Sequence, residues 1–143
     1  MKIFIATLLL FFSAPSVFAA QMATFGKYQV HYNAMSTAYL APSVARNYRI
    51  DRSKSRLLLT ISVLRHDHPG VAQAVPAAVE ANAANMSDQL QTIDMREIKE
   101  GTAIYYIGVG RVTPPDTLTF HVTVTPKGEK TAHTVKFKHQ FYE

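Results

Sequence analysis

The stretch RLLLTISVL, residues 56 to 64, is apolar on both faces if the chain is extended. A second run, AIYYIGVGRV at residues 103 to 112, has the same character. A strand with one face in water alternates apolar and polar residues, whereas a strand covered on both faces reads as a nearly continuous apolar run. These two segments are therefore expected to be central strands of a sheet.

The segments around these two runs also have strand patterns. Apolar residues alternate with polar ones in 28–32, 117–125 and 133–141, and two less regular candidates cover 75–86 and 90–98. Turn residues separate the segments at 68–70, 99–101, 114–116 and 126–129. About seven short strands joined by short links predict an all-β fold, a single immunoglobulin-like antiparallel β-sandwich. One short helix is expected over residues 41–48.

The chain begins with the features of an exported protein. Lys2 is followed by an apolar run from Ile3 to Phe12, which is too short for the ~20 residues that cross a bilayer. Val17-Phe18-Ala19 then supplies small residues at the positions that a signal peptidase reads. We predict a signal peptide at 1–19, cleavage after Ala19, and one periplasmic or secreted domain at 20–143 with no transmembrane segment.

Composition excludes several classes of function. The chain has no Cys, which rules out thiol catalysis, thiolate metal sites and disulfides. Without Lys2 the predicted domain has 14 basic and 10 acidic residues, a formal charge of +4. That excess favours anionic partners but is far below the charge density of a nucleic-acid binder, so no nucleic acid is expected.

The densest charge lies in RIDRSKSR, residues 49–56, between the expected helix and the first central strand. Loops at the ends of sandwich folds commonly carry binding residues, and guanidinium groups bind carboxylate or phosphate through paired hydrogen bonds. The predicted anion-binding residues are Arg46, Arg49, Arg52, Ser53, Lys54 and Arg56. The alternative is a charged rim in which Arg52 or Arg56 pairs with Asp94, Glu97 or Glu100, and such surface pairs carry no function.

Two histidines form the best candidate for a metal site. His66 and His68 project to the same side of an extended strand, as in many His-x-His pairs. Two imidazoles need a third ligand, for which the sequence offers the other histidines or, for copper, Met86 and Met95. Metal handling is therefore the alternative function, and no cofactor is otherwise expected.

No arrangement typical of an enzyme is present. Ser53 lacks the Gly-x-Ser-x-Gly setting of an activated nucleophile. Asp94 and Glu97 have odd spacing, which places them on opposite faces of a strand. We therefore expect a binding protein rather than an enzyme.

Three segments resemble one family of small exported bacterial proteins. IDRSKSRLLLTISVL, DMREIKEGTAIYYIG and TVKFKHQFY are similar to the domain-of-unknown-function family 4426, over about Thr24 to Tyr142. Arg52-Ser53 matches its Thr-Arg-Ser motif, with Asp51 where the family has Thr, and Tyr105-Tyr106 matches its paired tyrosines. The resemblance implies a single β-sandwich-like domain in a Gram-negative envelope, and it implies no activity.

Taken together, the sequence predicts an exported, non-enzymatic envelope module. Its basic loop, 46–56, is expected to contact an envelope protein or another anionic envelope component. Tyr105 and Tyr106 are expected to pack, one ring in the core and the other over a sheet face. Gly108 and Gly110 share the face of Tyr106 and leave it thinly covered, which indicates either room for a neighbouring aromatic ring or a bulge, and we favour packing.

Overall fold

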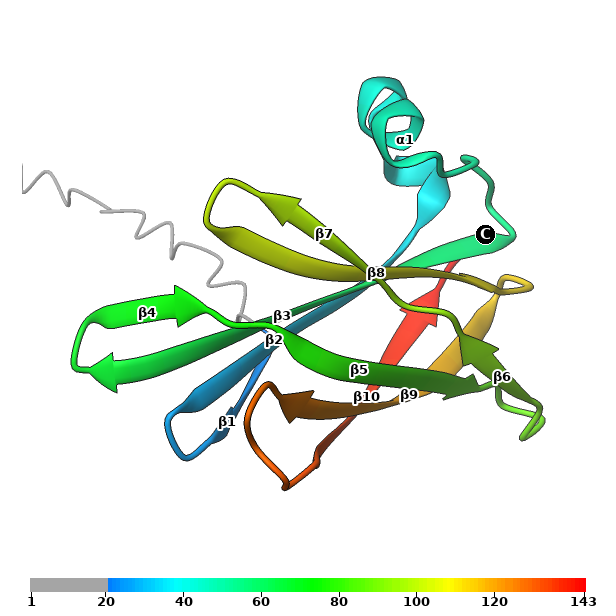
Figure 1. Ribbon diagram of the computed structural model, residues 1–143. Coiled ribbons are helices and arrows are strands. Elements are labelled where there is room, and N and C mark those ends of the chain that lie inside the picture. The colour runs from blue at the N-terminus through cyan, green and yellow to red at the C-terminus, as the bar shows by residue number, and fades with distance from the viewer. Residues whose placement is uncertain (1–20) are drawn as a thin grey trace, which may run out of the picture.

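The computed structural model describes residues 21–143 (Figure 1). The elements, in chain order, are β1 (Met22–Phe25), β2 (Tyr28–Ser36), the 3-10 helix η1 (Thr37–Tyr39), α1 (Pro42–Tyr48), β3 (Arg56–His68), β4 (Val71–Ala74), β5 (Ala77–Ala84), β6 (Leu90–Ile93), β7 (Arg96–Glu100), β8 (Ala103–Arg111), β9 (Asp116–Pro126) and β10 (His133–Phe141). The predicted signal peptide and its cleavage site lie outside the described residues. No helix within 21–143 has the length and apolar character that crossing a bilayer requires.

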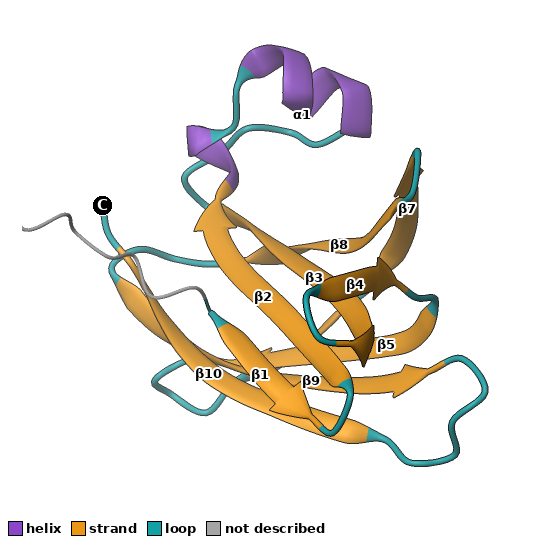
Figure 2. Cartoon of the chain, turned by 90° about the vertical axis from the view of Figure 1, so that its left-hand side faces the viewer, coloured by secondary structure: helices purple, strands orange, loops and turns teal. Residues whose placement is uncertain are grey.

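Two antiparallel sheets pack face to face, as Figure 2 shows. The six-stranded sheet has the order β1-β2-β3-β8-β7, with β4 paired to one end of β3. The four-stranded sheet has the order β10-β9-β5-β6. The predicted all-β sandwich with one short helix is thus confirmed, and both apolar runs are central strands of the larger sheet.

Short connections join most sequence neighbours as hairpins. β1 pairs with β2, β3 with β4, β5 with β6, β7 with β8, and β9 with β10. Four of these turns place a glycine in the left-handed region, among them Gly70 (φ 78°) and Gly101 (φ 58°), a conformation that glycine adopts without steric cost. The pairings of β3 with β8 and of β5 with β9 join strands that are distant in the chain.

The main core lies between the inner faces of the two sheets. Leu57, Leu59 and Ile61 of β3 are completely buried there, and so is Phe120 of β9. The ring of Phe137 stacks on Phe120 with centroids 4.9 Å apart. Alternation along each strand sends the other side chains outward, which is why this core has the period of two seen in the sequence.

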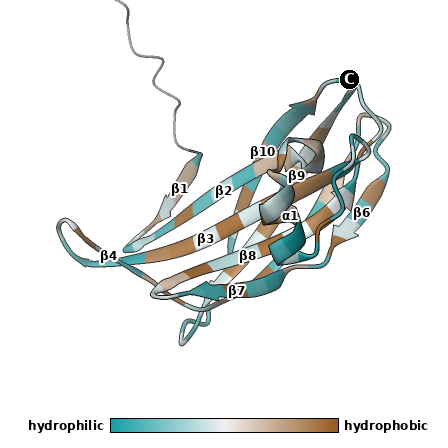
Figure 3. Cartoon of the chain, turned by 90° about the horizontal axis from the view of Figure 1, so that it is seen from above, coloured by the Kyte–Doolittle hydropathy of each residue, from teal (hydrophilic) through white to brown (hydrophobic). Residues whose placement is uncertain are grey.

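A second, smaller core covers the outer face of the larger sheet. Leu58 of β3 and Ile107 of β8 point outward and are buried against Ala45 of α1, together with Leu40 and Ile50. Figure 3 shows α1 above β3 and β8 on this face. The helix therefore supplies the second cover that a doubly apolar strand requires.

Residues 21–143 form ten strands, whereas the sequence patterns predicted about seven. β1 and β4 are four-residue strands whose length gives little periodic signal. The candidate at 90–98 is two strands, since β6 belongs to the smaller sheet and β7 to the larger one. The chain therefore changes sheets between Ile93 and Arg96.

Gly108 makes this change of sheet possible. A Cβ atom at Gly108 would lie 2.6 Å from Ile93 Cγ2, 2.6 Å from Met95 Sδ and 2.8 Å from the Asp94 carbonyl oxygen. The crossing segment therefore packs directly on the bare backbone of β8. The space at Gly108 is thus filled by Ile93, Met95 and the Asp94 backbone, and not by an aromatic ring.

We predict that Gly108→Ala lowers the free energy of unfolding by about 1–3 kcal/mol, because the added methyl forces the backbone at Asp94 to move. Gly110→Ala is the matched control and should cost less, since its Cβ would meet side-chain atoms of Gln91 and Leu57 at 3.0–3.2 Å. Urea denaturation of both variants measures the difference. Equal losses would show that the crossing is not tightly packed.

His133 and His139 lie on the inner face of β10 at its two ends. His133 stacks on Phe25 at 4.6 Å, and His139 meets the ring of Phe141 edge-on at 4.7 Å. Burial lowers the pKa of His139 below its ordinary value of 6.5. The folded protein therefore favours the neutral imidazole at this position.

This direction of the pKa shift predicts a loss of stability in acid. The unfolded chain takes up a proton at His139 more readily than the folded one, so stability is full above about pH 6.5 and falls as the pH drops through the lowered pKa. His139→Leu should reduce the slope of the free energy of unfolding against pH between about 7 and 5. An unchanged slope in the His139 variant would contradict the prediction.

Candidate functional site

The basic loop connects the end of α1 to the beginning of β3. Arg49 ends the helix in a left-handed conformation (φ 56°), with its N–H directed at the carbonyls of Ala45 and Arg46. The Ile50 N–H then donates to the Ala45 carbonyl at 2.8 Å, and the Ile50 side chain is buried in the outer core. This capped turn fixes the direction in which the loop leaves the helix.

Thr37 anchors the middle of the loop. Its side chain is completely buried, and its Oγ1 accepts the Ser53 N–H at 2.9 Å and donates to the Ser53 carbonyl at 3.1 Å. Ser36 Oγ also donates to that carbonyl, at 3.4 Å. Sequence reasoning missed Thr37, for which the only signal was a Ser-Thr pair following an alternating strand.

Ser53 is consequently a structural residue of the loop. Its N–H is held by Thr37, and its Oγ accepts the Ser55 N–H at 3.1 Å and lies 2.9 Å from Ser55 Oγ. The hydrogen-bonding groups that the sequence offered to an anion at these two serines are thus engaged inside the loop.

Three of the predicted arginines come together around the helix end. Arg46, Arg49 and Arg52 line an open hollow of about 380 Å³, together with Asp51. The Arg52 Nη2 donates to the Ala38 carbonyl at 3.1 Å, which ties this side chain to η1. Lys54 lies exposed in the turn before β3 and is not part of the hollow.

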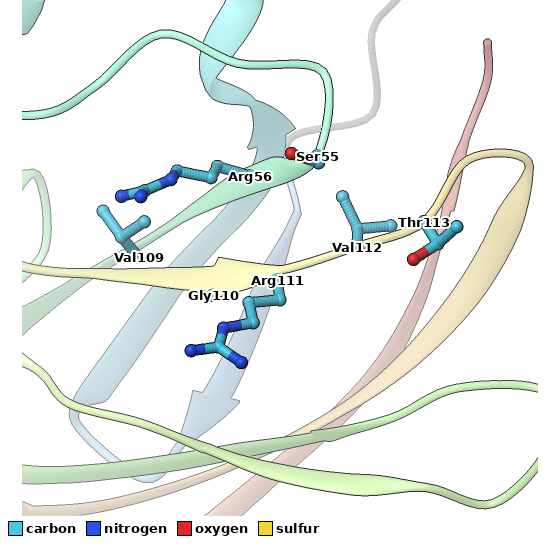
Figure 4. A pocket seen from close by; sticks show the side chains of 7 residues that line it. All are labelled: Ser55, Arg56, Val109, Gly110, Arg111, Val112 and Thr113. Carbon is cyan, nitrogen blue, oxygen red and sulfur yellow. The ribbon is translucent and has the colours of Figure 1, made fainter.

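Arg56 belongs to a different hollow, at the end of the larger sheet. This hollow has a volume of about 510 Å³ and is lined by Ser55, Arg56 and residues 109–113 (Figure 4). Arg56, the first residue of β3, lies directly opposite Arg111, the last residue of β8. The register thus places two arginines at the same end of the sheet, and Figure 4 shows their side chains extending to opposite sides of the β8 ribbon.

Hydrogen bonds fix the backbone at Arg111. The Gln91 side chain accepts the Arg111 N–H at 2.8 Å and donates to the Arg111 carbonyl at 2.7 Å. The Val112 N–H donates to the Ser55 carbonyl at 3.1 Å, which extends the pairing of β3 with β8. No local pattern singles out Arg111, because only the register of β3 with β8 places it opposite Arg56.

The ion pairs predicted for a charged rim do not form. The described residues contain three ion pairs, Arg56–Asp51 at 3.5 Å, Arg65–Asp67 at 2.9 Å and Lys99–Glu97 at 3.4 Å. Glu100 accepts a hydrogen bond from the Tyr48 hydroxyl instead. The acidic residues of β7 therefore stabilise other contacts, and Asp51 alone neutralises Arg56.

The histidine pair lacks the arrangement of a metal site. His66 Nε2 lies 2.9 Å from Gln29 Oε1, and the pairing of β3 with β4 shifts register between Arg65 and His68. Across residues 21–143, no three His, Asp or Glu side chains gather as metal ligands. A third ligand of these types for His66 and His68 is thus not in place.

The two tyrosines of β8 separate as predicted. Tyr106 is buried in the core, where its hydroxyl accepts the Ala77 N–H at 2.8 Å and donates to Glu97 at 3.0 Å. Burial raises the pKa of Tyr106, and the hydrogen bond to Glu97 adds to that rise. Tyr105 points to the outer face and remains 38% exposed.

We predict that Thr37→Val destabilises the protein by about 1–3 kcal/mol, because the partly buried Ser53 N–H then loses its partner and the Ser53 carbonyl loses one of its donors. Thr37→Ser keeps the hydroxyl and should cost clearly less. Chemical denaturation of the two variants separates the hydrogen bonds from the packing of the methyl group. Equal losses would assign the role of Thr37 to packing.

Comparisons with known proteins identify the family. A family model described as a domain of unknown function, DUF4426, matches residues 22–143. The crystal structure of a DUF4426 family protein from Pseudomonas aeruginosa PAO1 is 28% identical, with a TM-score of 0.72, covering 85% of this chain and 94% of that one. This match confirms the resemblance seen in the sequence.

A second solved structure shares the fold. FetP of uropathogenic Escherichia coli strain F11, expressed recombinantly in the E. coli periplasm, has a TM-score of 0.62 at 7% identity, covering 86% of this chain and 93% of that one. At that identity the likeness is one of fold alone. No curated protein matches this sequence. On the family model and the Pseudomonas structure together, this chain belongs to the DUF4426 family.

Proposed function

We propose that this protein is a non-enzymatic binding module, exported to the bacterial envelope, that binds an anionic partner at the strand end that carries Arg56 and Arg111. The observation that carries the proposal is the direct opposition of these two arginines across β3 and β8. Like charges at opposed positions of neighbouring strands destabilise a sheet, so this pair has a cost in the free protein.

The protein itself relieves that repulsion only weakly. Asp51 reaches Arg56 at 3.5 Å, but the side chains are 83% and 49% exposed, and exposed pairs of this kind contribute about 0–1 kcal/mol. The Arg111 guanidinium has no hydrogen-bond or ion-pair partner among residues 21–143. A carboxylate or phosphate bound at this strand end would lower the repulsion between the two positive charges and gain charge-assisted hydrogen bonds.

The surroundings suit a binding site that is formed in advance. Gln91 fixes the backbone at Arg111, and Thr37 fixes the loop that leads to Arg56. Arg46, Arg49 and Arg52 add positive charge around the neighbouring hollow. The site thus keeps Arg56 from the predicted basic loop, adds Arg111, and leaves the other arginines as a surrounding basic surface.

The choice of a binding role over an enzymatic one rests on the partners of the reactive side chains. Ser53 Oγ contacts Ser55 rather than a histidine, and His66 contacts Gln29. The proposal of export rests on the apolar run and the Val17-Phe18-Ala19 segment at the beginning of the sequence. Metal handling by His66 and His68 has no observation of this structure in its favour.

We predict that Arg111→Gln and Arg56→Gln each weaken binding of a hexaglutamate peptide by about tenfold or more, since each removes a charge-assisted hydrogen bond. The melting temperature should stay the same or rise, because the same change relieves the repulsion. Fluorescence anisotropy at low salt measures the affinity for hexaglutamate, and hexaglutamine is the neutral control peptide. Competition by inorganic phosphate tests whether phosphate binds at the same site as the peptide.

Lys136→Gln is the matched control. It removes one positive charge from an exposed position of β10, in the smaller sheet. If this variant weakens binding as much as Arg111→Gln, the interaction follows net charge alone and the proposed site is wrong.

A further inference from the structure

An apolar pocket lies near the arginine pair, on the same outer face of the larger sheet. α1 contributes Val44 and Tyr48 to its lining, β3 contributes Leu58 and Thr60, and β8 contributes Tyr105 and Ile107. Its volume is about 150 Å³. The pocket lies where the helix meets the sheet, beside the outer core.

Contacts between α1 and β7 hold this pocket open. The Tyr48 hydroxyl donates to Glu100, and the Arg96 guanidinium donates to the Tyr48 carbonyl. Both contacts fix the C-terminal end of the helix above the sheet. The spacing between helix and sheet is therefore set by polar contacts at the rim of the pocket, and its interior stays apolar.

An apolar strip connects the pocket to the arginine pair. Leu58 faces Val109 in the row next to Arg56 and Arg111, and Thr60 faces Ile107 two rows away. Val109 is 37% exposed, Tyr105 38% and Val44 38%. From Arg56 to Thr60 the strand rises about 14 Å, at ~3.4 Å per residue.

The geometry points to an acidic peptide segment of a partner protein as the occupant. We propose that the site recognises two features of this peptide at once. An apolar side chain enters the pocket, and a carboxylate about four residues away is bound at the strand end that carries Arg56 and Arg111. In an extended peptide, residues i and i+4 lie on the same face about 14 Å apart, which matches the distance along β3. This inference rests on the proposed function, because the arginine pair supplies its anionic half.

The size of the pocket selects a peptide over a lipid. An apolar cavity of about 150 Å³ accommodates a benzene-sized group, which corresponds to one aromatic or leucine side chain. A membrane acyl chain is several times longer than the pocket can enclose. The positive charge at one end and the small apolar pocket at the other therefore fit a short peptide motif.

The test compares three labelled peptides. Acetyl-Glu-Ser-Thr-Ser-Phe-amide carries both features at the proposed spacing, a second peptide has Ala in place of Phe, and a third moves Phe next to Glu. We expect the first to bind about tenfold or more tightly than the other two, because it alone buries an aromatic ring while its carboxylate contacts the arginines. Fluorescence anisotropy measures all three.

Two variants that fill the pocket, Thr60→Phe and Val44→Phe, should abolish the preference for the Phe peptide and leave the weaker binding of the Ala peptide unchanged. Arg111→Gln should weaken binding of both. Melting temperatures confirm that the variants fold, and the use of two filling positions guards against failure of either one.

The outcomes separate this inference from the proposed function. Arg111-dependent binding without a preference for the Phe peptide overturns the peptide motif and keeps the anion site. Binding that ignores Arg111 overturns both. Binding to phosphatidylglycerol vesicles that is lost in Thr60→Phe would assign the pocket to a lipid, and dimers that dissociate in Thr60→Phe would assign it to a second copy of this chain.

Discussion

Burial of β3 on both faces is the constraint on which the rest of the structure depends. Its inner side chains, among them Leu57 and Ile61, are completely buried against the smaller sheet, so Leu58 must find cover on the other side. α1 and Ile50 supply that cover. Because the helix lies over the strand that follows it, the connecting loop must return to the beginning of β3, which places the basic residues at one end of the sandwich.

The change of sheet between β6 and β7 has a comparable effect. The crossing packs on the bare backbone of Gly108 and brings β7 beside β8. β7 then supplies Arg96 and Glu100, whose contacts with Tyr48 hold the helix above the sheet. Because Gly108 has no side chain, the crossing segment can pack on β8. This packing brings together the two sheets and also positions the β7 residues at the rim of the apolar pocket.

The proposed site differs from its surroundings in how its polar groups are satisfied. Ser53, Thr37 and Gln91 are engaged in internal hydrogen bonds that shape the loop and the strand end. Arg56 and Arg111 remain exposed. Among the described residues their only ion pair is the weak one between Arg56 and Asp51. Charges that a fold places together without neutralising them mark a surface for an anionic partner, which is the physical basis of the binding role.

Local periodicity by itself determined the all-β class, the two central strands, the short helix and the membership of Arg56 in a basic loop, because side-chain alternation and turn residues act over a few neighbouring positions. Tertiary structure decided the pairing of β3 with β8, the division of residues 90–98 between two sheets, and the burial of Thr37. Only the pairing of β3 with β8 places Arg111 opposite Arg56. Strand register between distant segments follows from how two apolar faces pack, and no local pattern encodes it.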